Sequence, residues 1–332
     1  MMAILVAALM WSLVLILMLR AKQRPDNTLL WSAGVIAVSM TTNIELIYLW
    51  ASTWLPPNAL DLWANLLLVV GVGYLASAIR RGASAAGMAR EGEANRTRAA
   101  AVVTILVMVL AFSRIDAPEP STTFMLDYGD QLAAGLYSAV QYVFIGGVML
   151  GTLATCVRNV PRMIQPRFRI GFTLTGAGCA AALALCLSVV IMDVSHVAGQ
   201  LELMRSLGYV YDYLFVATMG LLCGGLSVPP LVRQVQVMQR LRKIRAIEPE
   251  VHRLWTATVA QTPSVSLVGS GRHVRTSPSR GPSQATERLH RMVVEIHDCL
   301  NVHGEAADRV SSADWKHLQD AETLCLRKGD AS

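Results

Sequence analysis

Seven long apolar segments in the first two-thirds of the chain constrain its fold more than any other feature. A helix needs roughly 20 predominantly apolar residues to cross a bilayer, and most of the segments reach or approach that length. Inside hydrocarbon the backbone must satisfy its own hydrogen bonds, which favours helices. We therefore expect an all-α protein with a seven-transmembrane-helix bundle, with spans at Ala3–Leu19, Leu29–Trp50, Leu62–Ile79, Ala99–Ser113, Gln131–Val157, Ile170–Met192 and Val210–Val232.

The charged residues divide the chain into two parts. Only 16% of all residues are charged, whereas about a quarter is usual for a soluble domain. The long apolar runs end by residue 232, and the remainder has the composition of a water-soluble domain. We predict a transmembrane domain over residues 1–232, a basic juxtamembrane helical stalk over 233–247 and a helical cytoplasmic domain over 248–332, with a flexible loop at 262–285.

Basic residues in the loops predict the orientation. With the N-terminus outside, the inner loops hold twelve Lys and Arg residues and the outer loops hold only Arg114 and Arg205. Cytoplasmic loops carry an excess of Lys and Arg, so we expect a multi-pass protein of the plasma membrane with a cytoplasmic C-terminus. The fourth segment is the weakest, because only fifteen residues separate Arg98 from Arg114, and the topology beyond it inverts if it does not cross.

Prolines and caps predict where the last helices begin and end. Proline removes a helical hydrogen bond, so we expect the seventh span to end near Pro229 and Pro230, with a kink there. The helices of the cytoplasmic domain are expected from Pro249 to about Ala260, from a Thr286 cap to about Val302, and from about Ser312 onward.

Polar residues toward the outer ends of the segments predict a ligand pocket. Glu45 is the deepest acid, and the outer loops and span ends are mostly acidic. Ionisable groups within a membrane are costly and are often functional. We predict an outward pocket for a cation, a proton or an amine-bearing ligand, formed by Glu45, Asn65, Gln141, Asp193 and Asp212. The alternative is that these are solvated carboxylates and that Glu45 pairs locally at the interface.

The stalk predicts contact with the membrane surface. Arg240, Arg242, Lys243 and Arg245 follow the last apolar segment. Each basic side chain near anionic lipid contributes about 1 kcal/mol of binding, so we predict that these four contact anionic lipids. A soluble cytoplasmic protein is a further candidate partner through the C-terminal domain, and we expect no nucleic-acid partner because the basic tail carries no recognition motif.

Several short motifs have a structural interpretation that we prefer. Asp193 and His196 lie one helical turn apart, but without further ligands they make a weak metal pattern. Gly147 and Gly151 form a GxxxG pair that predicts close helix packing. His297 and Asp298 resemble the phosphoacceptor site of one class of histidine kinases, but too few residues follow for an ATP-binding domain. We therefore expect an ordinary amphipathic helix there, and no enzyme activity, metal or cofactor.

The C-terminal part resembles a known group of proteins. The string Arg253-Leu254-Trp255, followed by Pro263, Leu267, Arg288-Leu289, Arg291, Val294-Glu295-Ile296, Asp298 and Leu300, resembles the C-terminal domain of an uncharacterised actinobacterial membrane-protein family. The resemblance implies seven spans and a C-terminal domain of unknown function. Members of that family are often catalogued as transporters, and they usually carry arginine at the position of His297. The resemblance implies no catalytic residues.

Three functional hypotheses follow. The first is a sensory or regulatory protein, in which a seven-helix membrane domain is coupled to the cytoplasmic helical domain. The second is a transporter of a small cationic or amine-bearing solute, which would need a site near the middle of the membrane. The third is a membrane scaffold for a soluble regulator. We favour the first, because the chain continues from the seventh span through the stalk into the cytoplasmic domain.

Overall fold

The computed structural model describes residues 2–19, 21, 26–85, 93–163, 166–259, 282–302 and 310–326. The chain divides into two compact units, Met1–Leu231 and Val232–Ser332. All the regular structure in the described ranges is helical, so the expected all-α class is confirmed. Most of the loop predicted at 262–285 lies outside the described residues.

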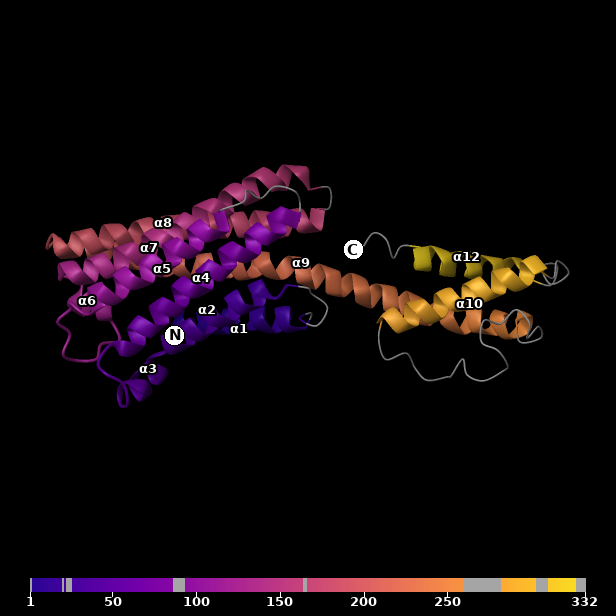
Figure 1. Cartoon of the computed structure of the whole chain (residues 1–332), viewed down its shortest axis with the longest axis horizontal. Helices are drawn as coiled ribbons and strands as arrows, with labels where there is room; N and C mark the ends of the chain where they lie inside the picture. The colour runs from indigo at the N-terminus through magenta and orange to yellow at the C-terminus, as the bar shows by residue number, and fades with distance from the viewer. Residues whose placement is uncertain are drawn as a thin grey trace. The chain divides into compact units, whose positions relative to one another are not determined.

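The first unit is a bundle whose long helices lie side by side (Figure 1). Its core is built from residues of every long helix. In chain order its elements are α1 (Met2–Met18), α2 (Thr28–Thr42), α3 (Glu45–Ser52), α4 (Ala59–Ala85), α5 (Glu93–Phe112), α6 (Phe124–Tyr128), α7 (Leu132–Asn159), the 3-10 turn η2 (Val160–Arg162), α8 (Pro166–Val197) and the first part of α9 (Leu201–Thr258).

Five helices of the described residues are long and apolar enough to cross a membrane: α4, α5, α7, α8 and α9. The pair α2 and α3 makes a sixth if it is counted as one bent span, and α1 is apolar but shorter. The fourth predicted segment is among the five, because α5 begins at Glu93, several residues before the expected start.

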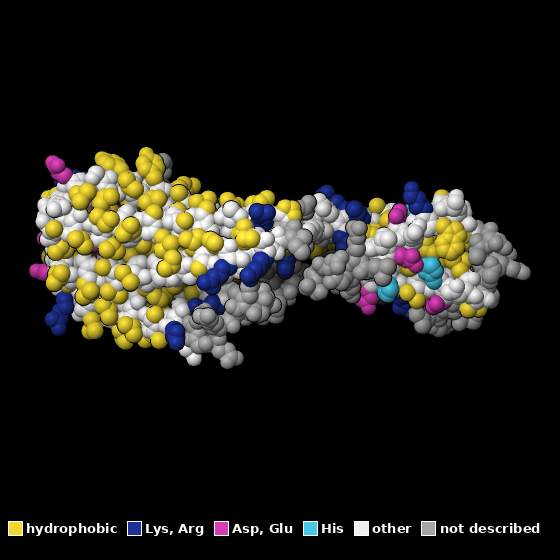
Figure 2. Space-filling view, turned by 90° about the horizontal axis from the view of Figure 1, so that it is seen from above, with side chains coloured by type: hydrophobic (Ala, Val, Ile, Leu, Met, Phe, Trp, Pro, Cys, Tyr) yellow, Lys and Arg dark blue, Asp and Glu magenta, His cyan; other side chains and the backbone are white. Residues whose placement is uncertain are grey.

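Hydrophobic side chains cover the sides of the first unit (Figure 2). Trp31, Leu110, Val143 and Leu187 are each between 63% and 67% exposed. A soluble monomer rarely exposes so large an apolar surface, whereas lipid hydrocarbon solvates it well. The helices are therefore compatible with a multi-pass membrane protein.

The two ends of the first unit differ in charge. At one end, which we call the acidic end, Asp61 and Asp212 line one cavity, and Asp127 accepts a hydrogen bond from Thr123 of the same lining. At the other, the basic end, Arg80 and Arg162 line two neighbouring cavities, and Figure 2 shows most of the visible Lys and Arg side chains of this unit toward that end.

The second predicted span is not one helix. α2 ends at Thr42, Ile44 is extended, and α3 starts at Glu45 after a bend of 73°. The hydroxyls of Thr41 and Thr42 donate to the carbonyls of Ala37 and Ser39, and such local bonds from Thr and Asn compete with helix continuation. The prediction of an unbroken helix over Leu29–Trp50 was therefore wrong.

Helices α2 and α4 pack closely in an antiparallel register. The hydroxyl of Ser32 donates to the carbonyl of Gly71 at 2.8 Å, and that of Ser39 donates to the carbonyl of Ala64 at 2.7 Å. Both hydroxyls are buried, so these bonds satisfy polar groups that would be costly in lipid. Gly71 makes the approach possible, because a Cβ there would lie 2.4 Å from Ile36 Cγ1.

The seventh apolar segment belongs to a helix far longer than expected. α9 runs without a break from Leu201 to Thr258, through Pro229, Pro230 and Pro249. The predicted end near Pro229 and the predicted new start at Pro249 were therefore wrong. Tertiary packing explains the difference, because α9 residues on both sides of each proline belong to a buried core, as Cys223 and Ile244 do.

The second unit consists of α9 from Val232 onward, α10 (Pro282–Val302) and α12 (Ser312–Leu326), which lie side by side in Figure 1. Ile244, Val251, Leu289, Ile296 and Leu318 form the centre of its core. The predicted end of one helix near Val302 and the predicted start of the next near Ser312 are confirmed. Thr286 is not a cap, because α10 begins at Pro282, whose fixed φ suits a first helical turn.

Candidate functional site

The acidic end of the first unit contains a cavity of about 630 Å³. Four of the five residues predicted to bind a ligand line it: Asn65 from α4, Gln141 from α7, Asp193 from α8 and Asp212 from α9. Aromatic side chains of α7 and α9 complete the wall, among them Tyr142, Tyr211 and Phe215. The structure therefore gathers distant polar residues of four helices around one space of ligand size.

Asp193 is the most unusual group in this cavity. It is only 7% exposed, and its Oδ2 atom has no hydrogen-bond partner. Ser138 of α7 hydrogen-bonds to the carboxyl group, and no salt bridge joins Asp193 to a basic side chain in the described part of the chain. A buried carboxylate without a counter-charge is costly, so this site favours a ligand that brings a positive charge or a proton.

The neighbouring polar side chains are held by one another. Gln141 Nε2 donates to Asn65 Oδ1 at 2.9 Å, and Asn65 Nδ2 donates to the Tyr137 hydroxyl at 3.0 Å and to Asp61 Oδ2 at 3.1 Å. Tyr142 and Tyr211 hydrogen-bond through their hydroxyls. These bonds leave Asn65 and Gln141 rigid, which makes them positioning groups for the cavity wall.

Glu45 does not belong to this cavity. The break before α3 places it at the exposed first position of that helix, outside the cavity lining. Its predicted depth depended on an unbroken second span. Asp212 is exposed at the rim.

The sequence reasoning did not identify Tyr137, Ser138, Tyr142, Tyr211 and Phe215 as cavity residues. For Tyr137 and Ser138 a helical spacing could have indicated this, because they lie one turn before Gln141 on α7.

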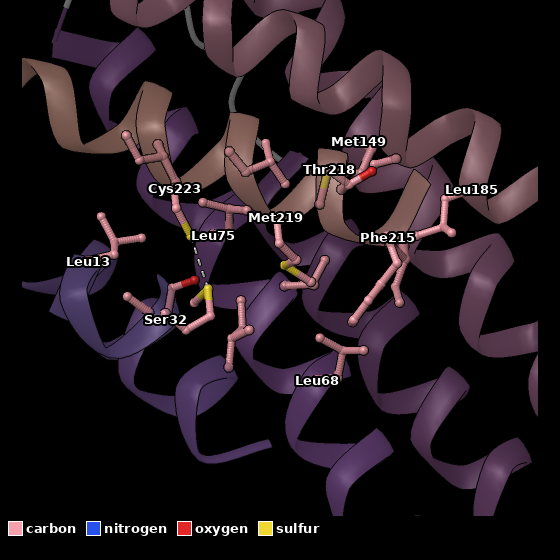
Figure 3. A pocket seen from close by; sticks show the side chains of 18 of the residues that line it. Leu13, Ser32, Leu68, Leu75, Met149, Leu185, Phe215, Thr218, Met219 and Cys223 are labelled. Carbon is pink, nitrogen blue, oxygen red and sulfur yellow. Dashed lines mark hydrogen bonds between the residues drawn. The ribbon is translucent and has the colours of Figure 1, made fainter. Parts of the chain in front are cut away.

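A second, smaller cavity of about 80 Å³ lies in the middle of the bundle (Figure 3). Its lining is apolar and includes Leu68, Met149 and Met219, which Figure 3 shows pointing into the space. The Cys223 thiol donates to Met10 Sδ at 3.4 Å. The Thr218 hydroxyl is buried there without a hydrogen-bond partner.

A third cavity of about 950 Å³ opens at the basic end. Arg81 Nη1 lies 3.0 Å from Asp26 Oδ2 at its edge. Hydrogen bonds from Thr28, together with this guanidinium, hold the pKa of Asp26 below its usual range. The carboxylate therefore stays ionised and ties the start of α2 to the end of α4.

The three cavities follow one another along the bundle. Along α8, Thr175 lines the basic-end cavity, Cys186 the central one and Asp193 the acidic-end one. Along α9 the order is reversed, because this helix runs the other way. Tyr142 and Phe215 are shared by the acidic-end and central cavities, and Leu29 and Leu226 by the central and basic-end cavities.

In the second unit, a buried carboxylate joins α9 to α10. Glu295 is 2% exposed, its Oε2 accepts from Trp255 Nε1 at 2.7 Å, and its Oε1 lies 3.1 Å from Arg291 Nε. Arg288 and Glu248 make a second link between these helices, at 2.9 Å.

His297 of α10 contacts two residues of α12. Its Nε2 lies 2.5 Å from Glu322 Oε1 of α12, and its ring lies near Trp315. These contacts give His297 a role in packing α10 on α12, in line with the interpretation that we preferred to a phosphoacceptor site.

A cap fixes the start of α12. Asp314 N donates to Ser311 Oγ at 3.1 Å, Ser311 Oγ donates to Asp314 Oδ2 at 2.7 Å, and Arg253 Nη2 lies 2.8 Å from Asp314 Oδ1. The hydrogen bond from Ser311 and the nearby Arg253 lower the pKa of Asp314, so this capping pair keeps its charge.

The four basic residues predicted to contact lipid have two kinds of environment. Arg242, Lys243 and Arg245 are exposed, as a lipid contact requires. Arg240 is half-buried and donates from Nη2 to the carbonyl of Leu324 at 2.7 Å, near the C-terminus of α12. Arg240 therefore stabilises the second unit itself.

Metal ligands do not gather in the described ranges, where no group of three or more His, Cys, Asp or Glu side chains could hold an ion. His196 lines the cavity beside Asp193, and its Nδ1 would lie 2.7 Å from a Cβ at Gly129. His196 thus packs against the turn before α7.

The comparisons with known proteins concern the second unit. Residues 236–324 match a family of unknown function, DUF6545. This range holds the α9–α10–α12 core, including Trp255 and Glu295, so the expected C-terminal domain of unknown function is present. Searches of curated proteins and of solved structures give no match.

Proposed function

We propose that this protein is a sensory or regulatory protein of the plasma membrane, with seven spans, an external N-terminus and a cytoplasmic DUF6545 domain. The apolar α1 and the bent pair α2–α3 would be the first two spans. The arginines at one end of the bundle support the orientation, because Lys and Arg mark the cytoplasmic side.

The acidic-end cavity would be the sensory site, and its ligand a small cation or amine. The unpartnered Oδ2 of Asp193 carries this proposal, since a buried carboxylate is best stabilised by a cationic group. Tyr142, Tyr211 and Phe215 supply aromatic faces, which also attract cations.

Helix α9 would transmit the signal. Its residues Tyr211 and Phe215 line the cavity, and its residues Ile244, Val251 and Leu254 belong to the core of the second unit. Because the helix has no break, ligand binding that moves or stiffens it can change the equilibrium of the cytoplasmic domain.

Reporter fusions test the topology. A periplasmic reporter such as alkaline phosphatase should be active when fused after Ser121, and inactive when fused after Arg162 or after Leu326. Activity at the C-terminal fusion would refute both the orientation and the cytoplasmic domain.

Substitution of Asp193 tests the site. We expect the full-length protein in nanodiscs to bind choline, and Asp193→Asn to weaken binding by about 10- to 100-fold, the equivalent of one charge-assisted contact. The neutral isostere 3,3-dimethylbutan-1-ol should bind the wild-type protein and the Asp193→Asn variant with the same affinity. Asp130→Asn, an acid outside the cavity lining, is the matched control.

Hydrogen exchange tests the coupling. Choline should change amide exchange in α10 of the wild-type protein, and the effect should be lost in a Gln236→Gly, Gln239→Gly variant, which loosens α9 at exposed positions. The alanine pair at the same positions is the control. Choline binding without any change in α10 would contradict the sensory role.

Transport is the second candidate, and the three successive cavities favour it. Proteoliposomes distinguish the two: choline uptake that Asp193→Asn abolishes would replace the sensory proposal by transport.

A further inference from the structure

A groove on the outside of the first unit has features that the proposed function does not use. It lies between α5 and α7, with α4 at its base, and has a volume of about 800 Å³. Most of its lining is apolar, including Val103, Ala139 and Val143. From Ala139 to Thr155, α7 rises by about 24 Å, which exceeds the roughly 15 Å depth of one leaflet of the hydrocarbon core.

Two glycines keep the groove open. Gly147 and Gly151 line it, and a Cβ on either residue would have no neighbour within 4 Å. Among the described residues, therefore, no other helix packs closely on this GxxxG pair. Small residues here create a hollow on a surface that is otherwise covered with large apolar side chains.

Basic and hydroxyl groups line one end of the groove. Arg80 of α4 and Arg96 and Thr97 of α5 lie there, at the basic end of the bundle. Arg80 Nη1 donates to Thr97 Oγ1 at 2.7 Å, which holds the guanidinium at the groove, and Arg96 is exposed beside it. Arginines at this position would face the headgroup region at the end of the groove nearest the basic end.

We propose that this groove binds an anionic phospholipid, with an acyl chain along Gly147 and Gly151 and the phosphate at Arg80 and Arg96. An apolar trough that ends in two guanidinium groups complements a molecule with an apolar chain and an anionic head. A second copy of the protein fits less well, because two concave surfaces related by twofold symmetry would leave a void between them.

Lipid binding by the full-length protein tests the proposal. In native mass spectrometry from detergent, phosphatidylglycerol should remain bound while phosphatidylcholine is lost. Each basic contact is worth about a fivefold change in affinity, so the double variant Arg80→Gln, Arg96→Gln should bind phosphatidylglycerol roughly 30-fold more weakly. Arg158→Gln with Arg169→Gln, which removes the same charge at exposed positions outside the groove lining, should leave the affinity unchanged.

A second variant tests the acyl-chain position. Gly147→Leu fills the groove without a clash at Cβ and should displace the lipid while the protein stays folded. Equal phosphatidylglycerol retention by Gly147→Leu and wild type would overturn the proposal. A wild-type dimer that dissociates in the Gly147→Leu variant would also overturn the proposal, because the groove would then bind a second copy of the protein. Full competition by inorganic phosphate would overturn it as well, because the groove would then bind phosphate alone.

Discussion

Replacing Gly225 by alanine is expected to lower the stability of the first unit by about 3 kcal/mol or more. Gly225 lies on α9 where this helix crosses α8, and a Cβ there would lie 2.4 Å from Thr175 Oγ1, 2.6 Å from Thr175 N and 2.9 Å from Gly171 O. Two of these atoms belong to the backbone of α8, so no rotation of a side chain relieves the overlap. The helices must move apart, and the packing around Cys179 and Leu222 is lost with them.

The neighbouring glycine provides the control. A Cβ at Gly224 meets nothing within 4 Å, so Gly224→Ala should be neutral or stabilising by about 0.5–1 kcal/mol, the usual gain of alanine over glycine in a helix. Thermal unfolding in one detergent, followed by size-exclusion chromatography of the surviving fraction, compares the two variants. Equal midpoints for Gly224→Ala and Gly225→Ala would show that α8 and α9 do not approach each other as closely as the structure has them.

Gly225 also shows why the apolar helices could be predicted from the sequence although some of their ends could not. Each apolar run is a local property, and the sequence alone indicated helical structure at each of them, although the second run is broken into α2 and α3. The continuation of α9 through Pro229 is not local. It depends on contacts of Leu222, Gly225 and Leu226 with other helices, and these contacts compensate for the hydrogen bond that proline removes.

The candidate site was predictable in part for a similar reason. Acidic residues at the ends of apolar segments can be recognised in a sequence, and Asp193 and Asp212 were identified in this way. Glu45 was misplaced because its depth depended on the helix continuing through Asn43, where local hydrogen bonds end it. Tyr142 and Phe215 were missed because an aromatic residue in a membrane helix has the same sequence pattern whether it faces lipid, a core or a cavity.

The Arg291–Glu295 pair illustrates how tertiary structure changes the meaning of a local pattern. Four residues apart on a helix, the two predict a surface pair worth a few tenths of a kcal/mol. In the structure Glu295 is buried against α9 and also accepts a hydrogen bond from Trp255, a residue of the string that carries the family resemblance. The DUF6545 match covers both Trp255 and Glu295.

Replacing Glu295 by alanine is therefore expected to destabilise the second unit by about 3 kcal/mol. The substitution leaves the partly buried Trp255 Nε1 donor without its acceptor beside the apolar core and opens a hole beside Ile296. The cost is not larger, because the Arg291 side chain is 44% exposed and can turn to water. Glu295→Gln should cost about 1 kcal/mol, since the amide oxygen still accepts from Trp255 while the charge is lost.

Hydrogen exchange in the full-length protein measures this effect where it arises. Amides of α10 should exchange about 100-fold faster in Glu295→Ala than in the wild-type protein, which corresponds to about 3 kcal/mol, while amides of α4 and α7 serve as an unchanged internal reference. Glu287→Ala removes an exposed carboxylate from the same helix and should leave exchange unaltered. If Glu287→Ala and Glu295→Ala behave alike, the hydrogen bond to Trp255 does not hold α10 against α9, and the core of the second unit rests on its apolar contacts alone.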